Sequence, residues 1–438
     1  MKIRVYYFFG LMFFILIIMI RPGKLTAQPH TDDLLKEMLG TNTAPAFQQV
    51  LQNPQVYKLQ IIYTKIDRDK NNRPHFQSYY FNYDSTLYFN PASTVKLAAA
   101  ALSLEKLNRI NRKGINRDTG MEFDSAFSKQ TRLVMDNTSP SGKPNIAHFI
   151  RRALIVGENT PYNRMYEFVG QQQFNRRLHA MGYLNTRITH RFIRLNEEEN
   201  RHTNPVRFYD EKGRLIYTQP AAYNPDRFEP GPNEWFGKGY MDNNDSLITG
   251  PFDFTNRNRI SLGALDNIVR SIIFPDAVPE HQRFDLRKSD YQLLRKYMSQ
   301  YAGENNFPKY DGEKYYPGFA KFFFRDSAHK SIPENIRVFN KTGWAYGFLT
   351  DNSYIVDFEN KVEFMLSATI YVNSDGILND GAYDYETIGH PFLYQLGQTV
   401  YTYELRRKRE AVPDLKVFEI KYDRRVVDDR PVISSVDN

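Results

Sequence analysis

Strand-forming runs lie near both ends of this 438-residue chain, while the long stretch between them is mostly helical in pattern. The early runs cover residues 57–63 and 77–81, and the late runs cover 336–339, 353–358 and 362–372. A sheet that uses both groups requires the helical middle to leave the sheet and return to it. We therefore expect an α+β fold: an antiparallel sheet flanked by terminal helices, an inserted all-helical lobe, and a cleft between the two lobes.

Helical patterns fill most of the remaining chain. The expected helices cover residues 32–53, 91–107, 146–156, 161–169, 262–273, 289–301 and 391–406. The region from about 196 to 258 is rich in Asn, Pro, Arg, Tyr and Gly and has little periodicity, which is typical of a long loop or an inserted subdomain. The tail from 410 to 438 is polar and charged, with one short apolar stretch at 415–420.

The N-terminus has the pattern of an export signal. Lys2 and Arg4 precede an apolar run over residues 5–20, and small residues at 25–27 supply a cleavage site before Gln28. We expect residues 1–27 to be a signal peptide and the mature protein to be periplasmic or secreted, in the cell envelope. If the signal segment stayed uncleaved, it would be the only contact with a membrane. The chain has no cysteine, which excludes disulfides, thiolate metal sites and lipid attachment through a cysteine.

The charge of the chain argues against nucleic acid as a partner. Residues 1–27 carry four basic groups and no acidic ones, so removing them reduces the formal net charge from +8 to +4. A mildly basic surface of this kind suits an anionic cell envelope, and no nucleic-acid-binding motif is present.

The segment Phe89-Asn-Pro-Ala-Ser93-Thr-Val-Lys96 places a serine at the start of an expected helix and a lysine one turn later on the same face. A serine hydroxyl needs a neighbouring base to become a nucleophile, and a buried lysine with a lowered pKa can be that base. The helix N-terminus also brings a backbone N–H to a developing oxyanion. Ser103-Leu-Glu-Lys106 repeats the same spacing further along the helix, where we interpret it as a solvated face.

Two further elements follow along the chain. Gly157-Glu158-Asn159 lies in the break between two expected helices, where the asparagine amide can point toward a cleft and accept a hydrogen bond from a lysine. Lys341-Thr-Gly343 follows the expected strand 336–339. On an edge strand, that lysine supplies a positive charge for a substrate carboxylate, the threonine adds a hydroxyl donor, and the glycine allows close approach of a substrate backbone.

In this order of elements the chain resembles the class A β-lactamase and penicillin-binding protein superfamily, whose signature is Ser-x-x-Lys, then Ser-Asp-Asn, then Lys-Thr-Gly. The resemblance covers most of residues 30–405 and includes the flanks Phe89-Asn-Pro-Ala and Asn159-Thr-Pro-Tyr-Asn163. It implies a β-lactamase/transpeptidase-like α+β fold and an activity that needs no metal and no other cofactor.

The resemblance also implies a role for each matching residue. Ser93 would be the acylated nucleophile, Lys96 its proton partner, and Asn159 the residue that positions both substrate and Lys96. The remaining roles fall on the third motif. Lys341 and Thr342 would hold the substrate carboxylate beside Gly343, and the backbone N–H groups of Ser93 and Trp344 would form the oxyanion hole.

Two departures from the family pattern bear on activity. Gly157 replaces the serine that relays a proton to the leaving nitrogen, and Glu158 replaces an aspartate. The family's deacylating glutamate lies in an Arg-x-Glu-Pro-x-x-Asn pattern, which Arg227-Phe-Glu229-Pro-Gly-Pro-Asn233 fits at an unusually long distance from Asn159. The stretch 186–191 lies nearer the expected place but has no glutamate, so two alternatives stay open: either Glu229 reaches the site, or its match is accidental.

Three functions are therefore compatible with the sequence. The first is a β-lactamase with Glu229 as deacylating base, and the second is a peptidoglycan D,D-peptidase or esterase that uses the same serine. The third is a non-catalytic envelope binding protein, which Gly157 favours and an intact Ser93 and Lys96 oppose. In each case we expect a monomer with a small-molecule β-lactam or peptidoglycan-like partner.

These expectations divide the chain into a signal peptide, one hydrolase domain of two lobes, and a polar tail. The bounds are 1–27 for the signal peptide; 28–405 for the domain, with its α/β lobe at 28–92 and 330–405 and its helical lobe at 93–329 including the insertion at about 196–258; and 406–438 for the tail.

Overall fold

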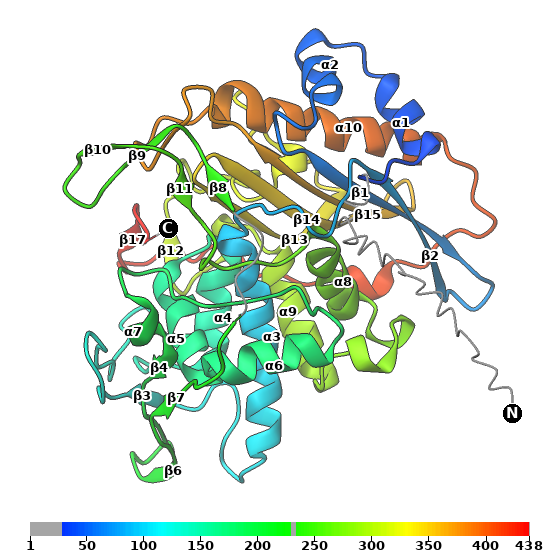
Figure 1. The fold of residues 1–438 in the computed structure, drawn as a ribbon. Helices are drawn as coiled ribbons and strands as arrows, with labels where there is room; N and C mark the ends of the chain where they lie inside the picture. The colour runs from blue at the N-terminus through cyan, green and yellow to red at the C-terminus, as the bar shows by residue number, and fades with distance from the viewer. Residues whose placement is uncertain (1–28, 229–233, 438) are drawn as a thin grey trace, which may run out of the picture.

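The structure of the protein is a computed structural model that describes residues 29–228 and 234–437 (Figure 1). The predicted signal peptide of residues 1–27 and the candidate base Glu229 lie outside the described residues. Within the described ranges, no helix combines the length and the apolar character that crossing a membrane requires.

A five-stranded antiparallel sheet forms the centre of the α/β lobe, with the order β13-β14-β15-β1-β2. Its strands are β1 (Gln60–Arg68), β2 (Pro74–Phe81), β13 (Ile336–Ala345), β14 (Phe348–Asp357) and β15 (Val362–Tyr371). The first two strands of the chain thus pair with the three long strands near its end, with β1 lying against β15. The expected α+β fold with an antiparallel sheet is confirmed, and β13 lies at one edge of that sheet.

Helices cover both faces of the sheet and give it two separate cores. On one face, α1 (Asp33–Gly40), α2 (Pro45–Gln52) and α10 (His390–Arg406) pack together and against β15. On the other face, α8 (Leu262–Ile273) and α9 (Lys288–Ser299) pack against the strands. Every residue of β14 is buried, because both faces of this strand are covered.

The rest of the helical lobe adjoins the second face, and α3 runs through its middle (Figure 1). Its helices are α3 (Val95–Ile110), α4 (Ile146–Ile155), α5 (Asn159–Val169) and α6 (Gln171–Ala180). Helix α3 packs against α4 and α5, which places the start of α3 and the break between α4 and α5 close together. This arrangement brings the first two sequence motifs into contact.

The region 196–258 contains α7 and short strands instead of one long loop, and further short strands lie outside it. Those inside are α7 (Glu197–Arg201), β4 (His202–Thr203), β5 (Val206–Tyr209), β6 (Leu215–Gln219), β7 (Ala222–Tyr223), β8 (Trp235–Phe236), β9 (Gly239–Met241), β10 (Leu247–Thr249) and β11 (Phe252–Asp253). Those outside are β3 (Met121–Phe123), β12 (Lys309–Tyr310), β16 (Ile377–Leu378) and β17 (Val432–Ile433). Strand β9 pairs with β16, and aromatic side chains of β8 and β11 pack near the β13–β14 turn, so this part of the region contacts the α/β lobe.

Three sequence expectations about elements were wrong in detail. The single helix expected over 32–53 is two helices, because Pro45 lacks a backbone N–H and begins α2 instead of continuing α1. Lys341-Thr-Gly343 lies inside β13 and not after it, and β14 begins five residues before the expected start. Polar residues in both strands weaken the strand pattern in the sequence. In the fold these polar residues are hydrogen-bonded: buried Asp351 of β14 accepts hydrogen bonds from Asn340 and Ser353.

A buried ion pair ties the early strands to the late ones. Arg68 of β1 makes a bidentate contact with Glu363 of β15, with Nε–Oε1 and Nη2–Oε2 distances of 2.6 and 2.7 Å. Tyr354 of β14 donates a hydrogen bond to the same carboxylate at 2.7 Å. Both charged side chains are almost fully buried, so the loss of one partner leaves an uncompensated charge in the core.

We therefore expect Arg68→Ala to lower the free energy of unfolding by about 3–5 kcal/mol. The matched control is Arg214→Ala, which removes an exposed arginine paired with Asp210 and should cost less than about 1 kcal/mol. Urea unfolding followed by circular dichroism measures both. Equal losses in the two variants would contradict the role given to Arg68.

Candidate active site

Ser93 lies in a short 3-10 turn, Ala92–Thr94, which leads directly into α3. The turn is held by its own polar groups: Ala92 N–H donates to Asn90 Oδ1 at 2.8 Å, and the Thr94 hydroxyl donates to the Pro91 carbonyl at 2.6 Å. Ala92 has a φ of +43°, a conformation that L-residues rarely adopt. Strain of this kind in a tightly held turn is typical of functional sites.

Lys96 lies one turn after Ser93 and is completely buried. Its ammonium nitrogen donates to the Gly157 carbonyl and, at 2.7 Å, to Asn159 Oδ1. Burial lowers the pKa of Lys96 well below the ordinary value, and the nearby charge of Lys341 lowers that pKa further. The site therefore favours a neutral amine at this position.

Gly157 connects α4 to α5 and lies between the two lysines. Its φ of +87° is readily adopted only by glycine, and its carbonyl accepts the hydrogen bond from Lys96. A Cβ added to Gly157 would lie 3.6 Å from Lys341 Nζ. The backbone of this loop thus contacts one lysine and faces the other.

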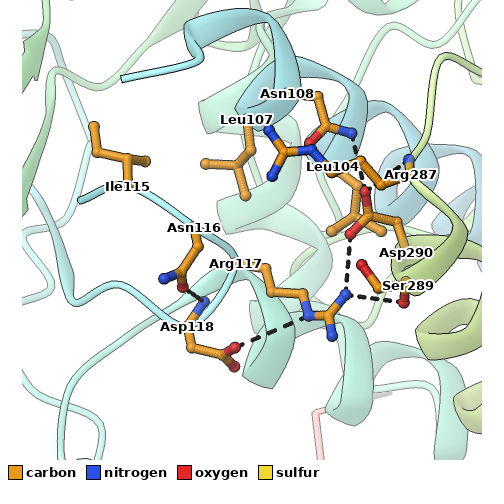
Figure 2. A pocket seen from close by; sticks show the side chains of 10 residues that line it. All are labelled: Leu104, Leu107, Asn108, Ile115, Asn116, Arg117, Asp118, Arg287, Ser289 and Asp290. Carbon is orange, nitrogen blue, oxygen red and sulfur yellow. Dashed lines mark hydrogen bonds and ion pairs between the residues drawn. The ribbon is translucent and has the colours of Figure 1, made fainter. Parts of the chain in front are cut away.

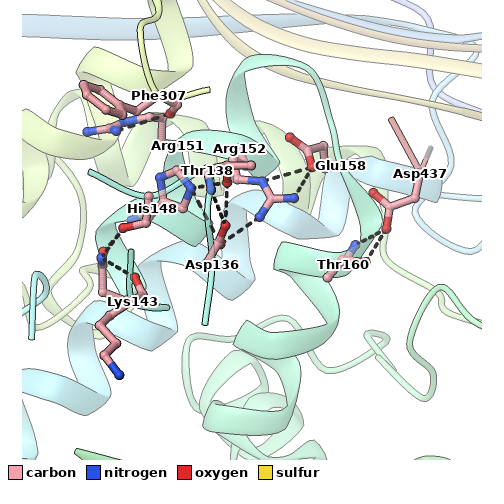
Figure 3. Close-up of polar contacts among 12 residues, drawn as sticks. Asp136, Thr138, Lys143, His148, Arg151, Arg152, Glu158, Thr160, Phe307 and Asp437 are labelled. Atoms are coloured by element: carbon pink, nitrogen blue, oxygen red, sulfur yellow. Dashed lines mark hydrogen bonds and ion pairs between the residues drawn. The ribbon is translucent and has the colours of Figure 1, made fainter. Parts of the chain in front are cut away.

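The buried Glu158 carboxylate is held by hydrogen bonds and an ion pair, and Figure 3 shows its contact with Arg152. Arg152 donates to its carboxylate, with a distance of 3.0 Å from Nε, and Tyr310 donates to it at 2.7 Å. Arg152 also pairs with Asp136 at 2.9 Å. Glu158 therefore fixes the loop to the core of the helical lobe and is not free to act as a base.

Strand β13 brings the third motif beside Ser93. A Cβ added to Gly343 would lie 2.5 Å from the Pro91 carbonyl and 3.0 Å from the Ser93 nitrogen, so only a glycine fits at this crossing. Lys341 is buried and donates to the carbonyl of Thr342 at 2.8 Å. Burial lowers the pKa of Lys341 to about 7, against the opposing effect of the Asp351 charge.

Two further residues of the third motif have different surroundings. The Thr342 side chain is buried, and among the described residues its hydroxyl has no hydrogen-bond partner. The Trp344 ring packs against Phe319 and Phe322, with ring centroids 5.5 and 5.6 Å away. The fold thus brings together Ser93, Lys96, Asn159, Lys341, Gly343 and, through its place in β13, Trp344.

Two residues near Lys96 carry no local sequence signal. The centroid of the Phe192 ring lies 5.1 Å from Lys96 Nζ, and Phe192 stacks on Tyr162 of α5. Asp437, near the end of the chain, accepts hydrogen bonds at the start of α5 and raises the pKa of Lys96 against the dominant effect of burial. Only the three-dimensional fold reveals these contacts, because both residues are far from Lys96 in sequence.

The stretch 186–191, which lies nearer the expected place of the deacylating glutamate, is a structural support. Arg191 is buried and pairs with Glu167 of α5 at 2.9 Å, and Arg187 pairs with Glu234 at 2.6 Å. Phe192, immediately after this stretch, presents an aromatic ring to Lys96. This segment supplies no carboxylate to the lysine.

A separate hollow of about 180 Å³ lies toward the other end of α3 (Figure 2). Its polar groups satisfy one another: Arg117 pairs with Asp290 at 3.0 Å, and Asn108 donates to the same carboxylate at 2.9 Å. This hollow is a structural junction between α3 and α9. Across residues 29–228 and 234–437, no three His, Asp or Glu side chains gather as ligands for a metal ion.

Comparison with solved structures gives matches among β-lactamases. For the β-lactamase from Francisella tularensis, sequence identity is 15%, coverage is 82% of this chain and 98% of that chain, and the TM-score is 0.46. For the enzyme from Xanthomonas campestris, identity is 13%, coverage is 84% and 98%, and the TM-score is 0.45. For a class A β-lactamase from Clostridium kluyveri, identity is 13%, coverage is 82% of this chain and 97% of that chain, and the TM-score is 0.44.

The sequence itself matches a family model. Residues 42–223 match the model described as the β-lactamase enzyme family, a range that includes Ser93, Lys96 and Asn159 and ends before Lys341. No curated protein sequence matches the chain. The resemblance indicated by the motifs is confirmed at this level: residues 42–223 are similar to the β-lactamase enzyme family.

Proposed function

We propose that the protein is a serine hydrolase of the class A β-lactamase type that acts on β-lactams through an acyl-enzyme on Ser93. The observation that carries this proposal is the buried Lys96, whose pKa is lowered one helical turn after the serine. A neutral amine in that place is the base that a serine nucleophile needs.

In the proposed acylation, Ser93 Oγ attacks the lactam carbonyl carbon and its proton passes to the Lys96 amine. The backbone N–H groups of Ser93 and Trp344 stabilise the oxyanion. Collapse of the tetrahedral intermediate breaks the carbon–nitrogen bond, and the leaving nitrogen takes up a proton. Gly157 has no hydroxyl to relay that proton, so the proton comes from the Lys96 ammonium or from water.

Recognition of the substrate carboxylate is assigned to β13. Protonated Lys341 supplies the positive charge, and the unpartnered hydroxyl of Thr342 is available as a donor. The charge on Lys341 also disfavours a charge on Lys96. One lysine therefore serves as the cation and the other as the base.

A second candidate is a D,D-peptidase or esterase that forms the same acyl-enzyme and releases it slowly. Phe192 favours it, because its ring lies over Lys96 and, among the described residues, the hydrogen-bond acceptors of Lys96 are a carbonyl and an amide oxygen and not a carboxylate. Glu229 stays the sequence-based candidate for activating the deacylating water of a β-lactamase. The lifetime of the acyl-enzyme separates the two functions.

We expect the protein without residues 1–27 to gain the mass of benzylpenicillin when the two are mixed, and to lose that mass as penicilloate accumulates. Intact-protein mass spectrometry over time follows both events. Ser93→Ala is the control, and it should show no adduct while keeping the fold. A long-lived adduct on Ser93 would favour the peptidase or esterase, and no adduct would favour a binding protein.

We expect the preference for carboxylate-bearing substrates to weaken as pH rises through about 7. The protonated form of Lys341 binds the carboxylate, and a pKa of about 7 means that this form is lost above that pH. The ratio of kcat/KM for a carboxylate-bearing substrate to that for a matched neutral ester should fall about tenfold per pH unit on the alkaline side. Because Lys96 affects both substrates alike, its titration cancels in the ratio; a flat ratio would remove Lys341 from carboxylate binding.

We expect Gly343→Ala to slow acylation about 100-fold, because its Cβ would push β13 away from the turn that holds Ser93. Gly303→Ala is a matched control, since a Cβ there meets nothing within 4 Å. Acylation by a fluorescent penicillin measures both variants. Wild-type rates in Gly343→Ala would show that the close crossing of β13 and the Ser93 turn is not needed.

A further inference from the structure

The C-terminal segment returns across the protein to the proposed active site. Leu415 and Phe418 are buried in the core shared with the helical lobe, and most of the residues from 419 to 437 are exposed. The end of the described chain lies beside the start of α5 and beside β12 (Figure 1). The segment is therefore part of the folded domain along most of its length.

An anchor holds this segment just before its last residues. Asp428 pairs with Lys309 of β12, and Arg430 donates to the Asn306 carbonyl at 2.7 Å. The Arg430 guanidinium also lies 4.0 Å from the centroid of the Phe307 ring. These contacts fix the point from which the final residues extend.

Residues 431–437, which we name the terminal strap, pair briefly with β12 and pack Ile433 and Val436 against the core. Strand β17 pairs with β12 over only two residues, and Asp311 N–H donates to the Ile433 carbonyl at 2.9 Å. Ile433 and Val436 are half-buried, and the other residues of the strap are exposed. A short pairing of this kind can open while the anchor stays in place.

The strap ends on the first turn of α5. The Asp437 carboxylate accepts hydrogen bonds from the backbone N–H of Thr160 at 2.8 Å and from the Thr160 hydroxyl (Figure 3). The Asp437 backbone carbonyl accepts a hydrogen bond from Asn159 N–H at 2.7 Å. Asp437 thus accepts hydrogen bonds from the backbone N–H groups of Asn159, the residue that holds Lys96, and of Thr160.

The charge on Asp437 opposes the state of Lys96 that catalysis needs. A carboxylate near an amine favours its protonated form, and Asp437 raises the pKa of Lys96 in this way. Glu158 acts in the same direction but is held by Arg152 and Tyr310. Asp437 is therefore the opposing charge that can leave the site.

We propose that the terminal strap is an internal competitor that occupies a peptide subsite formed by β12 and the start of α5. The ligand of that subsite is an extended peptide that carries a carboxylate, as the strap itself does. The competed reaction is acylation of Ser93, so this part of the proposal rests on the proposed function. Release of the strap frees the N–H groups of α5 and removes the negative charge from Lys96.

The first test compares two aspartates of the same segment. Asp437→Ala removes the contact with α5, while Asp429→Ala removes an exposed carboxylate that has no hydrogen-bond or ion-pair partner among the described residues. With a fluorescent penicillin, acylation of Asp437→Ala should be about five- to tenfold faster than that of the wild type, and Asp429→Ala should match the wild type. An unchanged or slower rate in Asp437→Ala would overturn the proposal, since Asp437 would then only support the site.

The second test adds the strap back as a separate molecule. A synthetic peptide with the sequence of residues 431–438 should slow acylation of Asp437→Ala toward the wild-type rate. The same peptide with alanine in place of the aspartate should not slow it. Equal effects of the two peptides, or no effect of either, would overturn recognition of a carboxylate-bearing peptide.

Hydrogen exchange separates this proposal from the proposed function. The amides of Asn159 and Thr160 should exchange faster in Asp437→Ala than in Asp429→Ala, whether or not any penicillin reacts. If neither protein is acylated but these amides lose protection, the proposed function fails and the docking of the strap stands. If protection is unchanged, the docking of the strap is refuted.

Discussion

The site depends on the burial of two lysines in one region of the protein. Lys96 and Lys341 are both buried, and the charge on Lys341 makes a charge on Lys96 less favourable. Burial is tolerated because each amine has an acceptor: Lys96 donates to Gly157 and Asn159, and Lys341 donates to the Thr342 carbonyl. This requirement fixes how closely α3, the loop before α5, and β13 approach one another, and the approach in turn places β13 against the turn that carries Ser93.

Gly157 makes this site differ from the family pattern, which has a serine at this position. A side chain at this position would be strained at a φ of +87° and would point at Lys341. The glycine instead offers its carbonyl to Lys96. The loop therefore offers a backbone carbonyl where the family pattern has a serine hydroxyl. In the proposed mechanism, the leaving nitrogen then takes its proton from the Lys96 ammonium or from water. The neighbouring Glu158 compensates for the flexible glycine, because its contacts with Arg152 and Tyr310 fix the loop from the opposite side.

Local patterns in the sequence could predict the sheet, most helices, and the place of Ser93 at the start of α3. The contact of Asn159 with Lys96 was also predictable, since the two motifs have complementary donors and acceptors. The extension of β13 beyond the expected strand 336–339 and through Lys341 was not, because its polar residues are stabilised by partners such as Asp351 on the neighbouring strand. Phe192 and Asp437 were not predictable either. Asp437 meets Asn159 across 278 residues of sequence, and nothing in the pattern of a polar tail records such a contact.

The two-residue strand β12 connects these features into one unit. Its Tyr310 donates to Glu158 and so helps to fix the loop that holds Lys96, while its backbone pairs with the terminal strap. The same loop is contacted a second time by Asp437 at the start of α5. A movement of the strap therefore acts on residues 157–160 by two routes, one through the hydrogen bonds of Asp437 and one through β12. Because Tyr310 is buried and Asp437 is exposed, the second route can stay intact while the first opens.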